Sequence, residues 1–212
     1  MMKNYTLSVG PLGTNAYLLV CMQGKSAWLV DAPEGVWEEV QPILAKTGHE
    51  LQGVLLTHGH WDHTQDLVTL RKHGAEIYAH EDSRPLVEDP ERTQGIFTFP
   101  EVKLEPAKID VPVKDGQKLE FCSTRCEVFA VPGHCPGSVA YYFPDEKYVF
   151  TGDVLFAGSV GRSDLPGGDW TTVEKSIREK LYTLPDEVIV YPGHGPETTI
   201  GQEKQFNPFV RQ

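Results

Sequence analysis

The stretch VLLTHGHWDH, residues 54–63, sets three histidines and one aspartate directly behind a run of apolar residues. The run LQGVLLT reads as a buried strand, so side chains that seek water follow a strand that avoids it. Burying several imidazoles and a carboxylate is costly, and a bound cation removes that cost. The stretch therefore indicates a strand of an α/β sheet with chemistry at its carboxyl end.

Three later strands end in the same manner. EVFAVPGHC delivers His134, YVFTGD delivers Asp153, and VIVYPGH delivers His194, each with a glycine beside it. In open α/β sheets, ligands bind beyond the carboxyl ends of the strands. We therefore expect these three loops and the 58–63 stretch to face one crevice.

The side chains on these loops are typical metal ligands. Neutral imidazole is the commonest one, and carboxylates complete sites for zinc or iron. The candidates are His58, His60, Asp62, His63, His134, Asp153 and His194. Seven ligands are too many for one tetrahedral ion and suit two ions with a bridging carboxylate; such a pair can share a water, lower its pKa and polarise a carbonyl or phosphoryl oxygen. The remaining histidines, His49, His73 and His80, are interpreted as ordinary hydrogen-bonding residues.

Strands and helices alternate along the chain. Strands are predicted at TLSV, AYLLVC, AWLVDA, LQGVLLT, EIYA, CEVFAV, SVAYYF, KYVFTG and EVIVY. Helices are predicted at Glu34–Lys46 with Gly48 as the stop, at Asp62–His73, and from a Thr171/Glu174 capping box to Pro185. Five prolines in residues 84–116 predict a long, partly irregular connection that forms a lid or a binding wall. The fold class is α/β, in one domain over residues 1–212.

Composition narrows the functional classes. The 212 residues carry a net charge of −11, which argues against a nucleic-acid binder because such proteins need a basic face. No apolar run approaches the roughly 20 residues of a membrane helix, and the N-terminus lacks a secretory signal, so we expect a cytoplasmic protein. Nothing in the sequence predicts its oligomeric state. We expect Cys21, Cys122, Cys126 and Cys135 to be thiols.

The motif HGHWDH at residues 58–63, followed by His134, Asp153 and His194, resembles the metallo-β-lactamase superfamily. The similarity runs from Asp31 in LVDAPEG to the last loop. It implies an αβ/βα four-layer sandwich with the metal site at one edge of two facing sheets. The implied ligands are His58, His60 and His134 for the first ion, Asp62, His63 and His194 for the second, and Asp153 as the bridge. Asp62 and Asp153 are thereby implied in catalysis, and Asp31 supports the histidine loop from behind.

The segments TGDVLFAGSVGRSDLPGGD and GHGPETTIGQEKQFNPF resemble the short glyoxalase II-like hydrolases of bacteria. This similarity implies a metallo-hydrolase with two divalent ions, zinc first and iron or manganese as alternatives. Its substrate would be a small-molecule thioester such as S-lactoylglutathione, attacked by metal-activated water. Arg162 is implied to contact the glutathione part, the alternative being a surface arginine paired with Asp164. Only residues 195–212 follow His194, so we expect no C-terminal glutathione-binding helical domain. Cys135 replaces a threonine common in relatives, either as a filler or near the metal.

Other activities remain open. A persulfide dioxygenase of the same superfamily would hold one iron with His58, His134 and Asp153 as its triad. A β-lactamase is disfavoured because no signal peptide is evident, and a nuclease because the chain is acidic and lacks a large insert. A non-catalytic metal-binding scaffold is a remote alternative, since scaffolds tend to lose ligands and all seven are present here.

Overall fold

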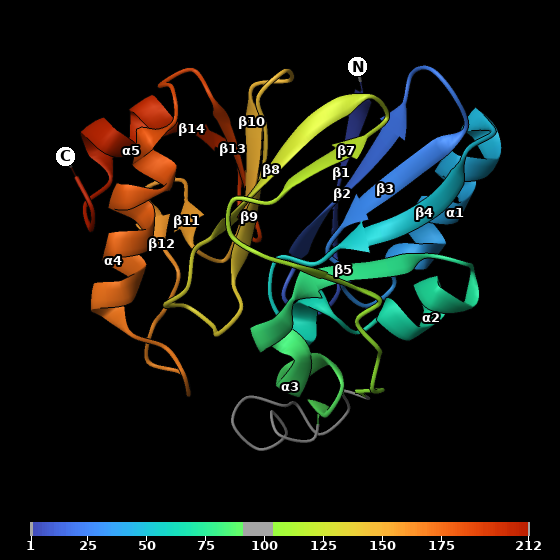
Figure 1. The fold of residues 1–212 in the computed structure, drawn as a ribbon, viewed down its shortest axis with the longest axis horizontal. Coiled ribbons are helices and arrows are strands. Elements are labelled where there is room, and N and C mark those ends of the chain that lie inside the picture. Colours follow the sequence, from blue (N-terminus) through green and yellow to red (C-terminus); the bar gives the residue numbers. More distant parts are fainter. Residues whose placement is uncertain (1, 91–103, 212) are drawn as a thin grey trace.

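The computed structural model describes residues 2–90 and 104–211, and its strands and helices form four layers. Figure 1 shows the two sheets in the middle, with α1 (Val36–Thr47) and α2 (Leu67–Lys72) on one side and α4 (Trp170–Glu179) and α5 (Ile200–Phe206) on the other. This helix–sheet–sheet–helix order confirms the α/β class and the αβ/βα sandwich. Among the helices of the described residues, none is long and apolar enough to cross a bilayer.

The first sheet has the strand order β1-β2-β3-β4-β5-β6. Its strands are β1 (Met2–Val9), β2 (Thr14–Cys21), β3 (Ser26–Val30), β4 (Glu50–Leu55), β5 (Glu76–His80) and β6 (Val111–Val113). The pairs β1–β2 and β2–β3 are antiparallel, whereas β3 to β6 run parallel. The start of β2 therefore lies at the same edge of the sheet as the end of β4.

The second sheet has the strand order β14-β13-β10-β9-β8-β7. Its strands are β7 (Lys118–Phe121), β8 (Thr124–Ala130), β9 (Val139–Phe143), β10 (Tyr148–Gly152), β13 (Ile189–Pro192) and β14 (Thr198–Thr199). β9 is antiparallel to both β8 and β10, and β13 is parallel to β10. The strands β8, β10 and β13 thus share one direction, and their carboxyl ends meet at one edge. A small hairpin, β11 (Leu155–Phe156) and β12 (Ser159–Val160), follows β10.

The core is divided among three apolar clusters, one between each pair of layers. Neighbouring residues of β2 serve different clusters: Leu18 packs beneath α1 and α2, while Tyr17 points between the sheets. β2 is buried along its whole length, which fits the apolar run from Ala16 to Cys21 that follows its first two residues. In α1, Gly48 has φ 70° and donates its N–H to Leu44 O at 2.8 Å, so the predicted stop is confirmed.

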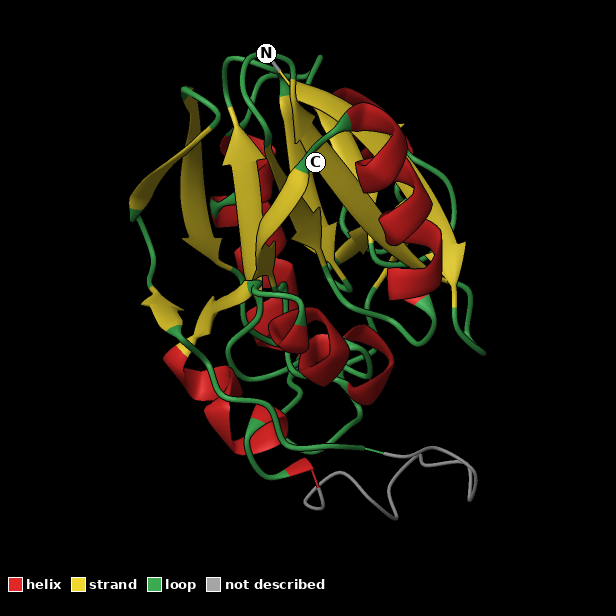
Figure 2. Ribbon diagram, turned by 90° about the vertical axis from the view of Figure 1, so that its right-hand side faces the viewer, coloured by secondary structure: helices red, strands yellow, loops and turns green. Residues whose placement is uncertain are grey.

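This topology places four loops at one edge of the sandwich, those that follow β4, β8, β10 and β13. Figure 2 shows loops and short helices gathered below the strands of both sheets. The site that the sequence predicts lies on these loops.

The prediction of one helix over Asp62–His73 is wrong. Trp61–His63 forms a 3₁₀ turn, and α2 begins only at Leu67. The helix begins late because Asp66 is held by another element: its N–H donates to Ala32 O at 2.9 Å, and its carboxylate accepts from Trp37 N at 3.1 Å. Tertiary contacts therefore override the local helical pattern.

One further expectation needs revision. The N-cap of α4 is Asp169 rather than Thr171, and its side chain accepts from Thr172 N at 2.8 Å. The connection over residues 84–116 contains a short helix, α3 (Arg84–Val87), and the strand β6. Residues 91–103 of that predicted irregular connection lie outside the described residues.

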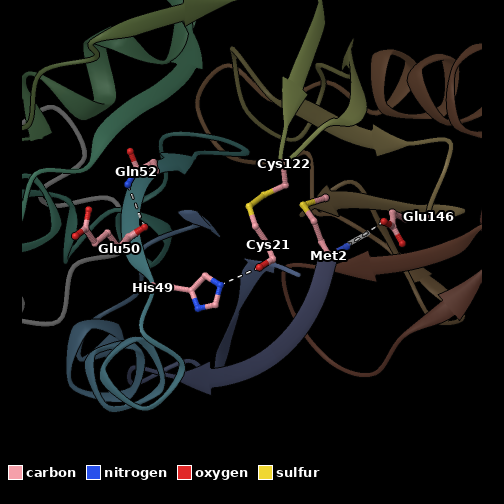
Figure 3. Close-up of a disulfide and its surroundings, with 7 residues drawn as sticks. All are labelled: Met2, Cys21, His49, Glu50, Gln52, Cys122 and Glu146. Atoms are coloured by element: carbon pink, nitrogen blue, oxygen red, sulfur yellow. Dashed lines mark hydrogen bonds between the residues drawn. A yellow bond between two sulfur atoms is a disulfide. The ribbon is translucent and has the colours of Figure 1, made fainter. Parts of the chain in front are cut away.

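The expectation that all four cysteines are thiols is wrong for two of them. Cys21 and Cys122 form a disulfide across 101 residues of sequence, with 5.4 Å between their Cα atoms, whereas Cys126 and Cys135 are free and buried. Figure 3 shows the bond beside His49, whose Nε2 lies 2.8 Å from Cys21 O. Cys21 ends β2 and Cys122 lies in the β7–β8 turn, so only the packing of one sheet on the other brings them together.

Reduction of this disulfide should lower the free energy of unfolding by about 2–4 kcal/mol, because the bond restricts a long loop of the unfolded chain. Denaturant melts with and without dithiothreitol measure the difference. The variant Cys21→Ala/Cys122→Ala should melt at one midpoint in both conditions. An unchanged midpoint for the wild-type protein under reductant would contradict the prediction.

Candidate metal centre

The four loops bring all seven candidate ligands to one edge of the sandwich. Two groups of potential ligand atoms lie within 4.8 Å of one another and match the two ligand sets that the sequence implies: the first group is His58, His60 and His134, and the second group is Asp62, His63 and His194. A further combination, His58, His63 and Asp153, satisfies the same distance limit and links the two groups through Asp153.

In the first group, two ring nitrogens face each other. His134 Nδ1 lies 2.7 Å from Arg162 O, so it must bear the proton, which leaves a lone pair on Nε2. That Nε2 lies 2.9 Å from His60 Nδ1. Two imidazole nitrogens can point at each other over this distance only around a shared proton or a cation.

The second group combines two imidazoles with a carboxylate. Asp62 Oδ2 lies 3.2 Å from His194 Nε2 and 3.4 Å from His63 Nε2. His63 is fully buried, whereas the side chain of His194 is 28% exposed. The second group is therefore the more open of the two.

Asp153 lies between the two groups. Its Oδ2 is 3.7 Å from His134 Nε2 and 3.4 Å from His194 Nε2, and its Oδ1 is 3.3 Å from His63 Nε2. One carboxylate thus faces imidazoles of both groups, which is the position that a bridging ligand requires.

Asp31 lies behind the histidine loop and orients it. β3 ends at Val30, one residue earlier than the aspartate, and Asp31 takes a left-handed φ of 59°. Its Oδ2 accepts from His63 Nδ1 at 2.8 Å, so His63 Nε2 is the ring nitrogen that faces the cluster. The position is the one that the similarity implied for Asp31.

Thr57 is a supporting residue that the sequence interpretation missed. Its N–H and its hydroxyl both donate to the Asp31 carboxylate, at 2.7 and 2.8 Å. Since that hydroxyl proton is used, Thr57 Oγ1 accepts from His58 Nδ1 at 3.0 Å, which leaves a lone pair on His58 Nε2. The available signal was its place directly before the HGHWDH motif at the end of a strand.

The electrostatics of the cluster follow from burial and from mixed charge. Burial and the neighbouring imidazole of His134 lower the pKa of His60 to about 3. Burial would also lower the pKa of His194, but hydrogen bonds to Asp153 and Asp62 raise it to about 9. Burial would raise the pKa of Asp153, but the adjacent His63 holds it well below its usual range. The carboxylates are therefore ionised, and positive charge concentrates around them.

Unsatisfied atoms test whether a cation fits here. His58 Nε2, His63 Nε2 and Asp153 Oδ1 are buried and have no hydrogen-bond partner in the described part of the chain. Buried polar atoms are rarely left without partners, and these three are all potential metal-ligand atoms. The residues fit divalent cations held by nitrogen and oxygen.

Two other predicted residues lie beside the cluster. The Arg162 guanidinium makes two hydrogen bonds to Asp164, at 2.7 and 2.8 Å, and its side chain is 49% exposed. Its carbonyl places it next to His134. Cys135 is fully buried, and burial raises the pKa of its thiol to about 12 although the Gly59 N–H opposes the shift. Cys135 belongs to none of the groups of potential ligand atoms, which supports its interpretation as a small filler.

Comparison with known proteins gives one consistent family. The sequence model of the metallo-β-lactamase superfamily matches residues 9–194. A probable metallo-hydrolase, YqgX of Bacillus subtilis, is 36% identical over 99% of this chain and 98% of its own length. The hydroxyacylglutathione hydrolase GloC of Haemophilus influenzae is 39% identical over 88% of each chain.

Solved structures agree in fold. The BLEG-1 B3 metallo-β-lactamase is 38% identical with a TM-score of 0.89, and each chain is covered completely. ETHE1 from Myxococcus xanthus is 27% identical with a TM-score of 0.82, covering 99% of this chain and 84% of the other. TTHA1623 in a di-iron-bound form is 36% identical with a TM-score of 0.80, covering 97% of this chain and all of the other.

Proposed function

Because the chain belongs to the metallo-β-lactamase superfamily, whose members bind divalent metals, we propose that it is a thioester hydrolase of the glyoxalase II-like type. Its substrate class is a glutathione thioester such as S-lactoylglutathione, and its products are a carboxylic acid and a free thiol. The observation that carries the proposal is the position of Asp153 between two groups of potential ligands, with orphaned atoms of both groups facing it.

In this proposal the chain holds two divalent ions. His58, His60 and His134 would hold the first, Asp62, His63 and His194 would hold the second, and Asp153 would contribute a carboxylate to both. When bound, such a pair would supply Lewis-acid chemistry, lowering the pKa of a water and polarising the thioester carbonyl. Zinc is the first choice, and iron or manganese suit the same ligands. The di-iron form of TTHA1623 supports the capacity of such a fold for two ions.

The protein side chains supply orientation and charge. Asp31 and Arg162 O fix the tautomers of His63 and His134, so that the ligand nitrogens face inward. Asp62 and Asp153 are the two carboxylates of the cluster, and both are ionised because the imidazoles lower their pKa values against the effect of burial. The hydrolase GloC, at 39% identity, supports the choice of a glutathione thioester.

Metal analysis of the purified protein together with hydrolysis of S-lactoylglutathione tests the proposal. Two ions per chain and release of free thiol, lost on chelation and restored by zinc, are the expected results. A parallel assay with penicillin as the substrate tests amide hydrolysis, which the similarity to the B3 enzyme suggests as an alternative. Hydrolysis of penicillin without any thioester cleavage would overturn the proposed substrate class.

The mono-iron persulfide dioxygenase is the second candidate, and the similarity to the ETHE1 chain keeps it in consideration. Its chemistry needs one iron and consumes oxygen. An oxygen electrode with glutathione persulfide as the substrate separates the two candidates. One iron per chain with oxygen uptake and no thiol release from S-lactoylglutathione would replace the hydrolase by the dioxygenase.

Replacing Arg162 by alanine should raise KM for S-lactoylglutathione about tenfold with little change in kcat, because a charged hydrogen bond to a substrate carboxylate is lost. A thioester of a thiol without carboxylates should be unaffected by the change. Arg125→Ala is the matched control, since Arg125 makes the same two-bond pair with Asp145 and is exposed. Equal KM values for wild type and Arg162→Ala would remove the Arg162 guanidinium from substrate binding.

A further inference from the structure

The first residues of β2 lie against the two loops that carry Asp62 and His194. β2 begins at Thr14 at the same sheet edge where β4 ends, so its start faces the metal centre and its end lies away from it. Thr14 and Asn15 are both buried, at 1% and 5% exposed. Neither carries a side chain that would be named as a metal ligand in this position.

Thr14 holds the carboxylate of Asp62. Its hydroxyl donates to Asp62 Oδ2 over 2.9 Å, and this oxygen is the one that faces His63 and His194. Because the contact is buried, no water takes the place of the hydroxyl if it is removed. Thr14 therefore fixes the rotation of the Asp62 carboxylate towards the second group.

Asn15 holds the loop that carries His194 from both sides. Its side-chain amide donates to Pro192 O at 3.0 Å and to Gly195 O at 2.8 Å, and its backbone N–H donates to Gly193 O at 2.7 Å. The two N–H groups of the Asn15 amide thus bond to the chain before and after His194. Tyr17 adds a third side-chain contact, from its hydroxyl to Pro192 O at 2.6 Å.

The first group of ligands is held by other residues. His58 Nδ1 bonds to Thr57, and His134 Nδ1 bonds to the carbonyl of Arg162. His63 depends on Asp31. Within the second group, β2 contacts Asp62 directly and His194 through the loop residues on either side of it, so β2 acts on one half of the centre.

We propose that Thr14 and Asn15 are positioning residues for the second divalent ion, and that they set its affinity independently of the first. This inference rests on the proposed two-ion centre and extends it to residues outside the ligand set. Supporting residues around a metal site change its affinity by about 10–100-fold when they are removed. Thr14 and Asn15 therefore determine how far the second position is filled at a given metal concentration.

Zinc titration of the metal-free full-length protein tests the proposal, using calorimetry and competition with a chelating dye. Thr14→Val keeps the shape of the side chain and removes the hydroxyl, and Asn15→Ala removes the amide. Both variants should bind the first ion within about threefold of the wild-type affinity and the second about 10–100-fold more weakly. Thr14→Ser restores the donor and should restore the second affinity.

Thr124→Val is the matched control, because Thr124 is a buried threonine at the start of β8, at the end of that strand remote from His134. It should leave both affinities unchanged, and thermal melts of the metal-free variants check that each is folded. If the wild-type protein binds two ions, and Thr14→Val and Asn15→Ala leave both affinities unchanged or weaken the two equally, the positioning role is overturned while the two-ion centre stands. Wild-type binding of fewer than two ions would overturn the two-ion centre, and this inference with it.

Discussion

Asp153→Ala should abolish thioester hydrolysis and leave less than one ion per chain. Asp153 is the only one of the seven candidate ligands whose oxygens lie near imidazoles of both groups, at 3.7 Å from His134 and 3.4 Å from His194. Its loss removes a bridging ligand and also removes the negative charge that balances the buried imidazoles. Stabilisation of the transition state by the ions is worth several kcal/mol, so kcat/KM should fall by about 10³-fold or more.

Metal analysis after gel filtration and the S-lactoylglutathione assay measure the two effects of Asp153→Ala. Asp186→Ala is the matched control, because Asp186 is an exposed aspartate whose partner is Lys204. The control should retain both ions and full activity. Two tightly bound ions and wild-type turnover in Asp153→Ala would remove Asp153 from the centre altogether.

The residues that form the centre could be found from the sequence because their chemistry conflicts with their surroundings. Three histidines directly behind a buried strand, and three later strands with the same ending, predict convergence wherever the strands share a direction. The structure supplies that shared direction, since β8, β10 and β13 run parallel to one another in one sheet. Their supporting residues gave no comparable signal, because Thr14, Asn15 and Thr57 are ordinary strand-end residues until their partners are known.

The errors share one physical cause, which is contact between distant segments. The Asp62–His73 pattern is locally helical, yet Asp66 bonds to Ala32 and Trp37 and delays the helix. The disulfide joins the end of β2 to a hairpin turn in the other sheet. None of these contacts follows from spacing along the chain.

Gly193 carries no ligand atom, yet Gly193→Ala should damage the centre almost as much as the loss of a ligand. A Cβ atom at this position would overlap with Asp153 Oδ1 and lie 2.8 Å from His63 Cε1. The backbone at Gly193 cannot shift to relieve this overlap without breaking hydrogen bonds. The Gly193 N–H donates to Gly152 O at 2.8 Å, and the Gly193 carbonyl accepts from Asn15 N at 2.7 Å. The glycine is thus required for close approach of the His194 loop to the bridging carboxylate.

Because these hydrogen bonds fix the backbone, the methyl group should displace the side chains of Asp153 and His63. Asp153 faces both groups, and His63 belongs to the second group. We expect less than one ion per chain, a fall in kcat/KM of about 10³-fold, and a loss of about 1–3 kcal/mol of stability in the metal-free protein. Gly195→Ala, in the same loop, separates sterics from backbone conformation: its φ is +76° and its Cβ would meet nothing within 4 Å. That variant should lose about 1–2 kcal/mol and keep both ions. If Gly193→Ala bound two ions as tightly as Gly195→Ala does, the prediction would be wrong. The close packing of the His194 loop on Asp153 would then not be required for metal binding.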